Sequence, residues 1–420
     1  DAMAEDGLRM DRFYAGSAVC SPTRAAVLTG RSPMRAGVPS HGHALRHQEV
    51  TLAEILAENG YQTSHFGKWH LNGLRGPGVP IFAHDRFHPG TFDFQTWLSV
   101  TNFFDRDPLL GRMGTIESHK GDSSEVVVAE ALKHLATLEK ERPFFSVIWY
   151  GTPHSPFKAS EEDLAPFKDL DPASMHHYGE LVALDRSVST LRTGLRELGI
   201  ERETLLWYCS DNGGLPKIEP PTVGGLRGNK GTLYEGGLRV PGILEWPGTI
   251  RPGRTEYPAC VMDILPTVLE LAGLEYPIPE RSLDGESLTP LFRGERSRLR
   301  TKPIGFRYKN GAAMVSNDWK IFTADLGKRR GYQLYQLRQD KAESKNVASE
   351  HPEKFREMKD ALTEFVRSTE ASIVGKEYAS GQVDPDHPEP EFWISREDYK
   401  PFFDEWETRW EYADWIKKRR

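Results

Sequence analysis

The most constraining feature of the sequence is an apolar run at residues 143–150, interrupted only by Ser146, which lies between two segments of helical periodicity. Residues 123–141 repeat apolar side chains along one helical face, and residues 178–198 precede a second apolar run at 205–210. Strands that are apolar on both faces need cover on both faces, and their alternation with helices is typical of a parallel sheet between helical layers. We therefore predict an α/β fold with a large, mostly parallel central sheet flanked by helices.

A capped helix and a short strand are predicted before these elements. Thr51 is a favourable N-cap, Glu54 follows three residues later, and Gly60 ends the helical pattern, so a helix is expected at residues 51–59. Residues 61–66 then fit a short strand.

The character of the chain changes after about Leu291, where short strand-like segments separated by turns replace the long alternating pattern. We expect a small antiparallel sheet followed by one helix. The predicted strands are residues 304–308, 312–315, 320–323 and 332–335, and the predicted helix is residues 352–367. The chain is accordingly divided into a main α/β domain, 1–290, and a smaller C-terminal subdomain with its tail, 291–420.

The tail beyond Glu391 is rich in aromatic side chains. They are Phe392, Trp393, Phe402, Phe403, Trp406, Trp410 and Trp415. Two interpretations stay open: these side chains pack an irregular tail onto the body, or they form a platform on which sugar rings stack.

Composition and charge exclude several classes of protein. Hydrophobic residues make up 38% of the chain and charged residues 27%, which is an ordinary globular composition rather than a disordered one. The formal net charge of −7 gives no general basic surface for nucleic acid or an anionic membrane. No stretch approaches the roughly 20 apolar residues of a membrane-spanning helix. Affinity for an anion must therefore come from local Lys and Arg side chains.

Cys20 stands apart from the other two cysteines. Three cysteines without metal-type spacing form neither a disulfide framework nor a zinc site, and Cys209 and Cys260 are expected to be buried hydrophobic side chains. Cys20 precedes a helix predicted at residues 23–29, whose free N–H groups and dipole favour an anion. Arg24, one turn further, can bind two oxygens of an oxyanion. The pattern indicates an anion site with a reactive side chain; the alternative is a helix-start cysteine of lowered pKa without a catalytic role.

Polar side chains follow three predicted strands at the point where each strand ends. Lys68 and His70 follow the first strand, His154 follows the second, and Asp211 and Asn212 follow the third. In open α/β sheets the chemistry lies beyond the carboxyl ends of the strands, so we expect these groups to meet at one edge. Taken singly, each of them could instead be a structural histidine or a turn residue.

The motifs occur in the order that characterises one enzyme family. They are residues 20–31 (CSPTRAAVLTGR), 67–71 (GKWHL), 153–156 (PHSP), 210–213 (SDNG) and 227–241 (RGNKGTLYEGGLRVP). This set resembles the type I, formylglycine-dependent sulfatases of the alkaline phosphatase superfamily, and the matches extend over nearly the whole chain. The resemblance implies an alkaline phosphatase-like fold and hydrolysis of sulfate monoesters.

The resemblance also implies a covalent mechanism. A maturation enzyme, either formylglycine-generating or anaerobic, would convert Cys20 to formylglycine. One oxygen of the hydrated aldehyde would attack sulfur and form a covalent sulfate intermediate. His70 would take a proton from the second hydroxyl so that sulfate is expelled, and Arg24 would hold the diol.

Three further residues match family positions that handle the sulfate. Lys68 and Lys230 would bind sulfate oxygens as point charges. His154, with Lys230, would protonate the leaving oxygen.

One divalent cation is implied as well, expected to be Ca²⁺ and bound by Asp211, Asn212 and the modified Cys20. The family usually begins with a strand followed by paired aspartates that complete the metal site, and no Asp-Asp pair precedes Cys20. We expect the sequence to be part of a longer protein that supplies this strand and its aspartates. The alternative is a fragment with impaired metal binding.

The loop at residues 72–112 is the candidate for substrate recognition, because inserted loops over a sheet edge carry specificity. Its side chains include His84, His88, Trp97 and Asn102, which we expect to bind a sulfated sugar. The alternative is that they pack the lid. An aryl sulfate would be a surrogate substrate.

Two other functions fit the motif set. One is a phosphonate or phosphodiester hydrolase of the same superfamily, and the other is an inactive homologue that binds sulfated glycans without hydrolysing them. Residues 1–6 do not read as a signal peptide, and only the family resemblance suggests a periplasmic or secreted location.

Overall fold

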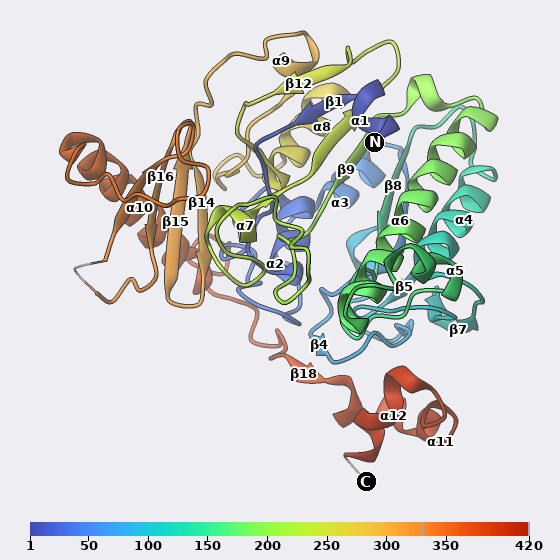
Figure 1. Cartoon of the computed structure of the whole chain (residues 1–420). Coiled ribbons are helices and arrows are strands. Elements are labelled where there is room, and N and C mark those ends of the chain that lie inside the picture. The colour runs from blue at the N-terminus through green and yellow to red at the C-terminus, as the bar shows by residue number, and fades with distance from the viewer. Residues whose placement is uncertain (329–330, 419–420) are drawn as a thin grey trace.

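The computed structural model describes residues 1–328 and 331–418. Figure 1 shows a central body of strands with helices around it, a smaller sheet at one end, and a separate tail. Helices α4 (Ser123–Leu135) and α6 (Pro172–Glu197) lie together on one side of the strands. A third helix, α3 (Leu52–Glu58), also packs against the strands. The predicted α/β class with a smaller antiparallel sheet is confirmed.

One sheet has five strands in the order β7–β6–β5–β3–β8. They are β3 (Gln62–Lys68), β5 (Thr96–Val100), β6 (Leu109–Arg112), β7 (Thr115–Ser118) and β8 (Phe144–Trp149). β3 pairs in parallel with β5 and β8, whereas β6 and β7 extend the sheet antiparallel. Along β8, Phe145 and Val147 join the cluster that contains α3, while Phe144 and Ile148 join the cluster between α4 and α6. The predicted cover on both faces of this strand is therefore confirmed.

A second sheet has four strands in the order β12–β1–β11–β9. They are β1 (Leu8–Met10), β9 (Leu206–Cys209), β11 (Gly242–Glu245) and β12 (Gly253–Thr255). The run at β9 is confirmed as a strand, but it pairs antiparallel with β11 instead of continuing the parallel sheet. Continuous apolarity marks a buried strand without setting the direction of its partner. Among the described residues, β8 and β9 each end their sheet and have one edge without a strand partner.

The sequence predicts that these helices exist, but it predicts their first and last residues less well. α3 has the expected capping box between Thr51 and Glu54. α4 ends at Leu135, before its predicted end. α6 begins at Pro172, earlier than predicted, because Asp171 caps the first free N–H groups and proline suits the first helical position.

The C-terminal part forms the predicted antiparallel sheet and helix. The elements are β14 (Ile304–Tyr308), β15 (Gly311–Ser316), β16 (Trp319–Thr323), β17 (Gln333–Gln336) and α10 (Pro352–Ile373). α10 packs on one face of this sheet through Met358 and Leu362. The other face, with Phe306 and Val315, belongs to the same hydrophobic cluster as the main body. The division of the chain at residue 291 stays a prediction.

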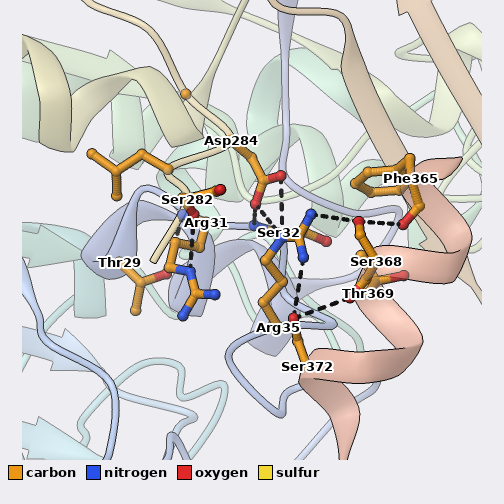
Figure 2. A network of polar contacts seen from close by, with 12 residues as sticks. Thr29, Arg31, Ser32, Arg35, Ser282, Asp284, Phe365, Ser368, Thr369 and Ser372 are labelled. Carbon is orange, nitrogen blue, oxygen red and sulfur yellow. Dashed lines mark hydrogen bonds and ion pairs between the residues drawn. The ribbon is translucent and has the colours of Figure 1, made fainter. Parts of the chain in front are cut away.

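A polar network joins α10 to the segment that follows α2 (Cys20–Thr29). Figure 2 shows Arg35 between Asp284 and α10. The Nε of Arg35 donates to Asp284 Oδ2 at 3.0 Å, and its two Nη atoms donate to the hydroxyls of Ser368 and Ser372 at 2.9 and 3.1 Å. Helix α10 is thereby joined to the segment that follows α2, the helix that carries Cys20.

The tail is held mainly by its aromatic side chains. Its elements are β18 (Glu391–Phe392), which pairs with β4 (Leu74–Arg75), and the helices α11 (Phe403–Trp406) and α12 (Trp410–Lys417). Trp393 and Trp406 are buried in one cluster with the body, as the packing interpretation predicts. Phe392, Trp410 and Trp415 are exposed, so a sugar-stacking role stays open only for these three.

Two smaller expectations also have an outcome. Cys260 is buried as predicted, whereas Cys209 is only half-buried. Within residues 1–328 and 331–418, no helix combines the length and apolarity that crossing a membrane requires.

Candidate active site

Cys20 is the first residue of α2, so this helix begins before its predicted start. Pro22 lies in the first turn, where its missing N–H is not needed. The Thr23 hydroxyl accepts the Ser17 N–H at 3.1 Å and holds the turn before the helix. Gly30 ends the helix with a φ of 64°, as predicted. The unpaired N–H groups of the first turn thus lie at Cys20 and favour an anion there.

Positive charge gathers around the Cys20 sulfur. Burial alone would raise the pKa of the thiol, but the ammonium groups of Lys68 and Lys230 outweigh burial and hold this pKa well below its ordinary value. Burial lowers the pKa of Lys68 to about 8. Lys230 is placed by its backbone, because its N–H donates to the Gly214 carbonyl at 2.9 Å. These charges stabilise an anionic group at position 20 or an anionic ligand in front of it.

The end of β3 places Lys68 and His70 on the same side. The side chain of Trp69, between them, is buried in the core, and the backbone N–H of Trp69 donates to the Val100 carbonyl at 2.9 Å. His70 has a φ of 58°, which is uncommon for a residue other than glycine. Its imidazole lies near Cys20, and both ring nitrogens are buried without a hydrogen-bond partner in the described part of the chain. Burial, and then the charge of Lys68, lower the pKa of His70 to about 3, so the ring is neutral and able to accept a proton.

The loop after β8 carries His154 to the same group of charges. Its Nδ1 donates to the Ser155 carbonyl at 2.7 Å, and its ring is stacked on Phe103 with centroids 4.3 Å apart. Burial, and then the charges of Lys68 and Lys230, lower the pKa of His154 to about 3. The structure therefore brings both predicted histidines to the surroundings of Cys20.

Arg24 connects α2 to the ends of two strands. Its Nε and Nη2 donate to Asp211 Oδ2 at 3.1 and 2.6 Å, and its Nη1 donates to the Lys68 carbonyl at 2.8 Å. Its guanidinium also lies over the Trp149 ring, 4.8 Å from the centroid. The resemblance implies a direct contact between Arg24 and the nucleophile. The bonds shown here go to Asp211 and the backbone and join α2 to the strand ends, and the contact of Arg24 with the nucleophile stays a prediction.

Asp211 and Asn212, the expected metal ligands, follow β9. The Oδ1 of Asn212 is buried without a hydrogen-bond partner, which fits an oxygen that binds a cation. Burial would raise the pKa of Asp211, but Arg24 outweighs it and lowers this pKa, so the carboxylate is ionised. Across residues 1–328 and 331–418, no three His, Cys, Asp or Glu side chains form a group able to hold a metal. The two residues therefore fit part of a Ca²⁺ site, which takes about 6–8 oxygens.

The loop that carries Lys230 is fixed from both ends. A Cβ at Gly213 would lie 1.9 Å from the Gly236 carbonyl oxygen, so glycine permits the approach of α7 (Glu235–Leu238) to the segment that carries Asp211 and Asn212. Glu235 is fully buried and lies 3.0 Å from the Lys320 ammonium of β16. Glu235 thus fixes this loop to the C-terminal sheet through Lys320.

The predicted substrate residues mostly make structural contacts. Trp97 is 1% exposed in the core and stacks with His88, centroids 5.2 Å apart, so its ring presents no surface to a sugar. The side-chain amide of Asn102 is buried and donates to a backbone carbonyl at 2.7 Å. His84 is exposed but lies 3.1 Å from Asp398 of the tail. These contacts agree with the lid-packing alternative. The mixture of polar and aromatic residues that suggested a sugar site also describes strand β5 and the residues around it.

Sequence reasoning missed three aromatic side chains at this site. Trp149 lies under Arg24 and Phe103 lies against His154. The Nδ1 of His41 lies 3.5 Å from the Cys20 sulfur. None of the three belongs to a motif with a recognisable spacing. The sequence pointed only to Trp149, because it lies at the end of the predicted strand that becomes β8.

Comparison with known proteins decides the family. The profile described as Sulfatase matches residues 1–274, and the profile described as N-sulphoglucosamine sulphohydrolase, C-terminal, matches residues 228–371. The chain is 34% identical over 338 residues to arylsulfatase A of Homo sapiens, covering 70% of this chain and 62% of that protein. The chain belongs to the sulfatase family.

A second relative of this sulfatase-family chain is N-acetylgalactosamine-6-sulfatase of Canis lupus familiaris. It is 32% identical over 351 residues, which cover 75% of this chain and 64% of the relative. The chain thus spans less than two thirds of the length of these relatives. The crystal structure of Ps i-CgsB superposes with a TM-score of 0.74 at 24% identity, covering 93% of this chain and 88% of that one, which supports the fold.

Proposed function

We propose that the chain hydrolyses sulfate monoesters, with formylglycine made from Cys20 as the nucleophile. The observation that carries this proposal is the gathering of Lys68, Lys230, His70 and His154 around the Cys20 side chain at a helix N-terminus. Membership of the sulfatase family supports it.

The arrangement of charge suits a sulfate group. A sulfate monoester carries one negative charge spread over three oxygens, and Lys68 and Lys230 supply compact positive charges to more than one of them. The first turn of α2 adds N–H donors on the side of Cys20. Because the charges are fixed before the ligand arrives, they stabilise charge that develops on oxygen in the transition state without reorganisation.

The two histidines suit opposite proton transfers. His70 is neutral beside residue 20, and the negative charge of a bound sulfate opposes that of Lys68, which raises the pKa of His70 and makes it a better acceptor for the proton of a hydroxyl there. His154 must be protonated to supply the leaving oxygen. The negative charge of a bound sulfate opposes Lys68 and Lys230, which raises the pKa of His154 and favours its acid form.

Formylglycine and Ca²⁺ are both part of the proposal. Formylglycine, when present and hydrated by one water, would supply two hydroxyls on one carbon, one to attack sulfur and one whose deprotonation would release sulfate and restore the aldehyde. Asp211 and Asn212 would hold Ca²⁺, which polarises the sulfate. Modification of Cys20 requires a formylglycine-generating or anaerobic maturation enzyme as partner. Family membership leads us to propose a periplasmic or extracellular location.

The proposed natural substrate is a sulfated carbohydrate. This is supported by the relative named N-acetylgalactosamine-6-sulfatase, whose name specifies a sulfated sugar. An aryl sulfate is the proposed surrogate, and the likeness to arylsulfatase A supports its use in assays.

The test combines mass spectrometry with turnover. The protein is co-expressed with a maturation enzyme, the peptide that contains Cys20 is weighed, and hydrolysis of an aryl sulfate is compared with that of an aryl phosphodiester. We expect a peptide lighter than the cysteine form, release of sulfate, and no turnover by Cys20→Ala, whose melting temperature should match that of the parent.

Three results would overturn parts of the proposal. Preference for the phosphodiester would replace sulfatase activity with phosphodiesterase activity. Fully converted protein that binds sulfated glycans but releases no sulfate in excess Ca²⁺ would mark a binding protein. Turnover by Cys20→Ala would remove residue 20 from the mechanism.

A further inference from the structure

His41 is a polar group at the nucleophile that the predicted catalytic set does not contain. Its Nδ1 lies 3.5 Å from the Cys20 sulfur. In the modified protein the sulfur is replaced by oxygen on the same carbon, so the Sγ marks the position where an oxygen of residue 20 would lie. His41 therefore faces a reacting atom directly.

The loop that carries His41 is fixed on both sides of this residue. The hydroxyl of Ser21, which follows the nucleophile, accepts the N–H of Gly42 at 3.0 Å. The carbonyl of His41 accepts the Nε–H of Arg75 at 3.2 Å. Gly42 has a φ of 69°, and a Cβ there would lie 2.5 Å from the Arg75 side chain. The peptide next to the imidazole is therefore attached to the same helix turn as Cys20, which sets the distance between the two side chains.

His41 and His70 approach residue 20 together. Their rings are stacked with centroids 6.2 Å apart and an interplanar angle of 24°. The His41 ring contacts the Cys20 sulfur, and the His70 ring beside it has two buried nitrogens without a hydrogen-bond partner among the described residues. A carbon that bears two oxygens can therefore present one oxygen to each ring.

We propose that His41 positions the nucleophile: its Nδ1 hydrogen-bonds one oxygen of the modified residue 20 and leaves the other oxygen to His70. This inference rests on the proposed function. Without His41, residue 20 rotates about its Cα–Cβ bond, and both oxygens exchange between attacking and non-attacking orientations. The loss is one of orientation, which lowers the rate of reaction in the bound complex rather than the binding of sulfate.

The experiment compares His41→Ala, His41→Asn and His43→Ala. The amide nitrogen of asparagine takes the place of Nδ1, and His43 is a half-buried histidine of the same loop that serves as the matched control. Each variant is first checked for formylglycine at residue 20 by peptide mass and for an unchanged melting temperature. Then kcat and KM are measured with an aryl sulfate.

We expect His41→Ala to lower kcat roughly 100-fold with KM within about twofold, at the lower end of the range for loss of one preorganised hydrogen bond. His41→Asn should recover part of kcat, and His43→Ala should match the parent. A second readout is independent of turnover: the hydrate held by His41 resists dehydration, so the alanine variant should label faster with a hydrazide, which reacts with the free aldehyde.

The outcomes separate this inference from the proposed function. A converted parent without turnover rejects the sulfatase proposal. An active parent with His41→Ala unchanged in kcat and in hydrazide labelling rejects only the role of His41. A raised KM at unchanged kcat also rejects it, because His41 would then bind substrate instead of orienting residue 20.

Discussion

Glu180 of α6 and Asp105 of the loop after β5 form a buried carboxyl pair that makes the stability of the protein depend on pH. They are 0% and 7% exposed, and Glu180 Oε2 and Asp105 Oδ2 are both buried without a hydrogen-bond partner among the described residues. Burial, and then the nearby carboxylate, raise the pKa of Glu180 to about 10, and burial raises the pKa of Asp105 to about 7. Asp122 adds to both shifts, and Arg106 opposes that of Asp105. We predict that Glu180→Gln stabilises the fold at alkaline pH.

The sign and size follow from proton binding. In the unfolded chain a glutamate ionises near pH ~4.3, so above that pH the folded protein holds a proton at Glu180 that the unfolded chain has lost. The free energy of unfolding therefore falls as pH rises, by about 1.4 kcal/mol per pH unit for one such proton. From pH 5 to pH 8 this amounts to at most about 4 kcal/mol. Glutamine removes this dependence, since it is neutral in both states.

The assay is denaturant unfolding of parent and Glu180→Gln at pH 5 and pH 8. The amide keeps an oxygen for the Lys158 N–H, which Glu180 accepts now, and can donate to Asp105. The control is Glu162→Gln, which removes a carboxylate from an exposed position of α5 (Glu161–Leu164). We expect Glu180→Gln to gain stability relative to the parent on going from pH 5 to pH 8, and the control to follow the parent. An equal difference between Glu180→Gln and the parent at both pH values would refute the reasoning.

Three other predictions follow from the site and its supports. Lys320→Met should destabilise the fold by about 3–5 kcal/mol in denaturant unfolding, because Glu235 and Glu343 lose their cation. Both glutamates are fully buried and lie within 3.0 Å of the Lys320 ammonium. A loss below about 1 kcal/mol contradicts this. Arg24→Lys should lower kcat/KM by roughly 10²-fold or more at unchanged formylglycine content, because lysine cannot make the paired contacts to Asp211 and the backbone; activity equal to the parent contradicts it. A chelator that removes Ca²⁺ should abolish turnover of aryl sulfate, and added Ca²⁺ should restore it. Asn212→Ala should need more Ca²⁺ for half-maximal rate. Turnover that resists the chelator argues against a metal at Asn212.

The sequence predicts those parts of the fold in which each residue pattern has one physical solution. The run at β8 is apolar on both faces, so it can only lie between two helical layers, and the structure shows this. The capping box of α3 is likewise a local arrangement that needs only Thr51 and Glu54. The pairing of β9 is different, because a strand is compatible with either direction of its neighbour until the partner is known. That partner, β11, is short and distant in sequence.

The site divides in the same way. Lys68, His70 and His154 follow strands directly, so the rule for strand ends predicted that they would meet. His41 comes from a loop between two helices, and its place depends on the Ser21 hydroxyl and on Gly42. Such a contact arises only when the loop is folded, and no spacing in the sequence records it. Trp97 shows the converse, since an aromatic residue in a polar loop resembles a sugar-binding residue until the strand around it is seen.

The unpaired edges of β8 and β9 have a consequence for handling the protein. β8 consists of Phe-Phe-Ser-Val-Ile-Trp, a run without lysine or proline, and soluble proteins commonly use those residues to prevent an edge strand from recruiting another chain. An edge of this kind is a template for strand addition, and apolar uncharged segments of about six residues favour growth into fibrils. We therefore expect a peptide that pairs with these edges to slow concentration-dependent aggregation of the folded body.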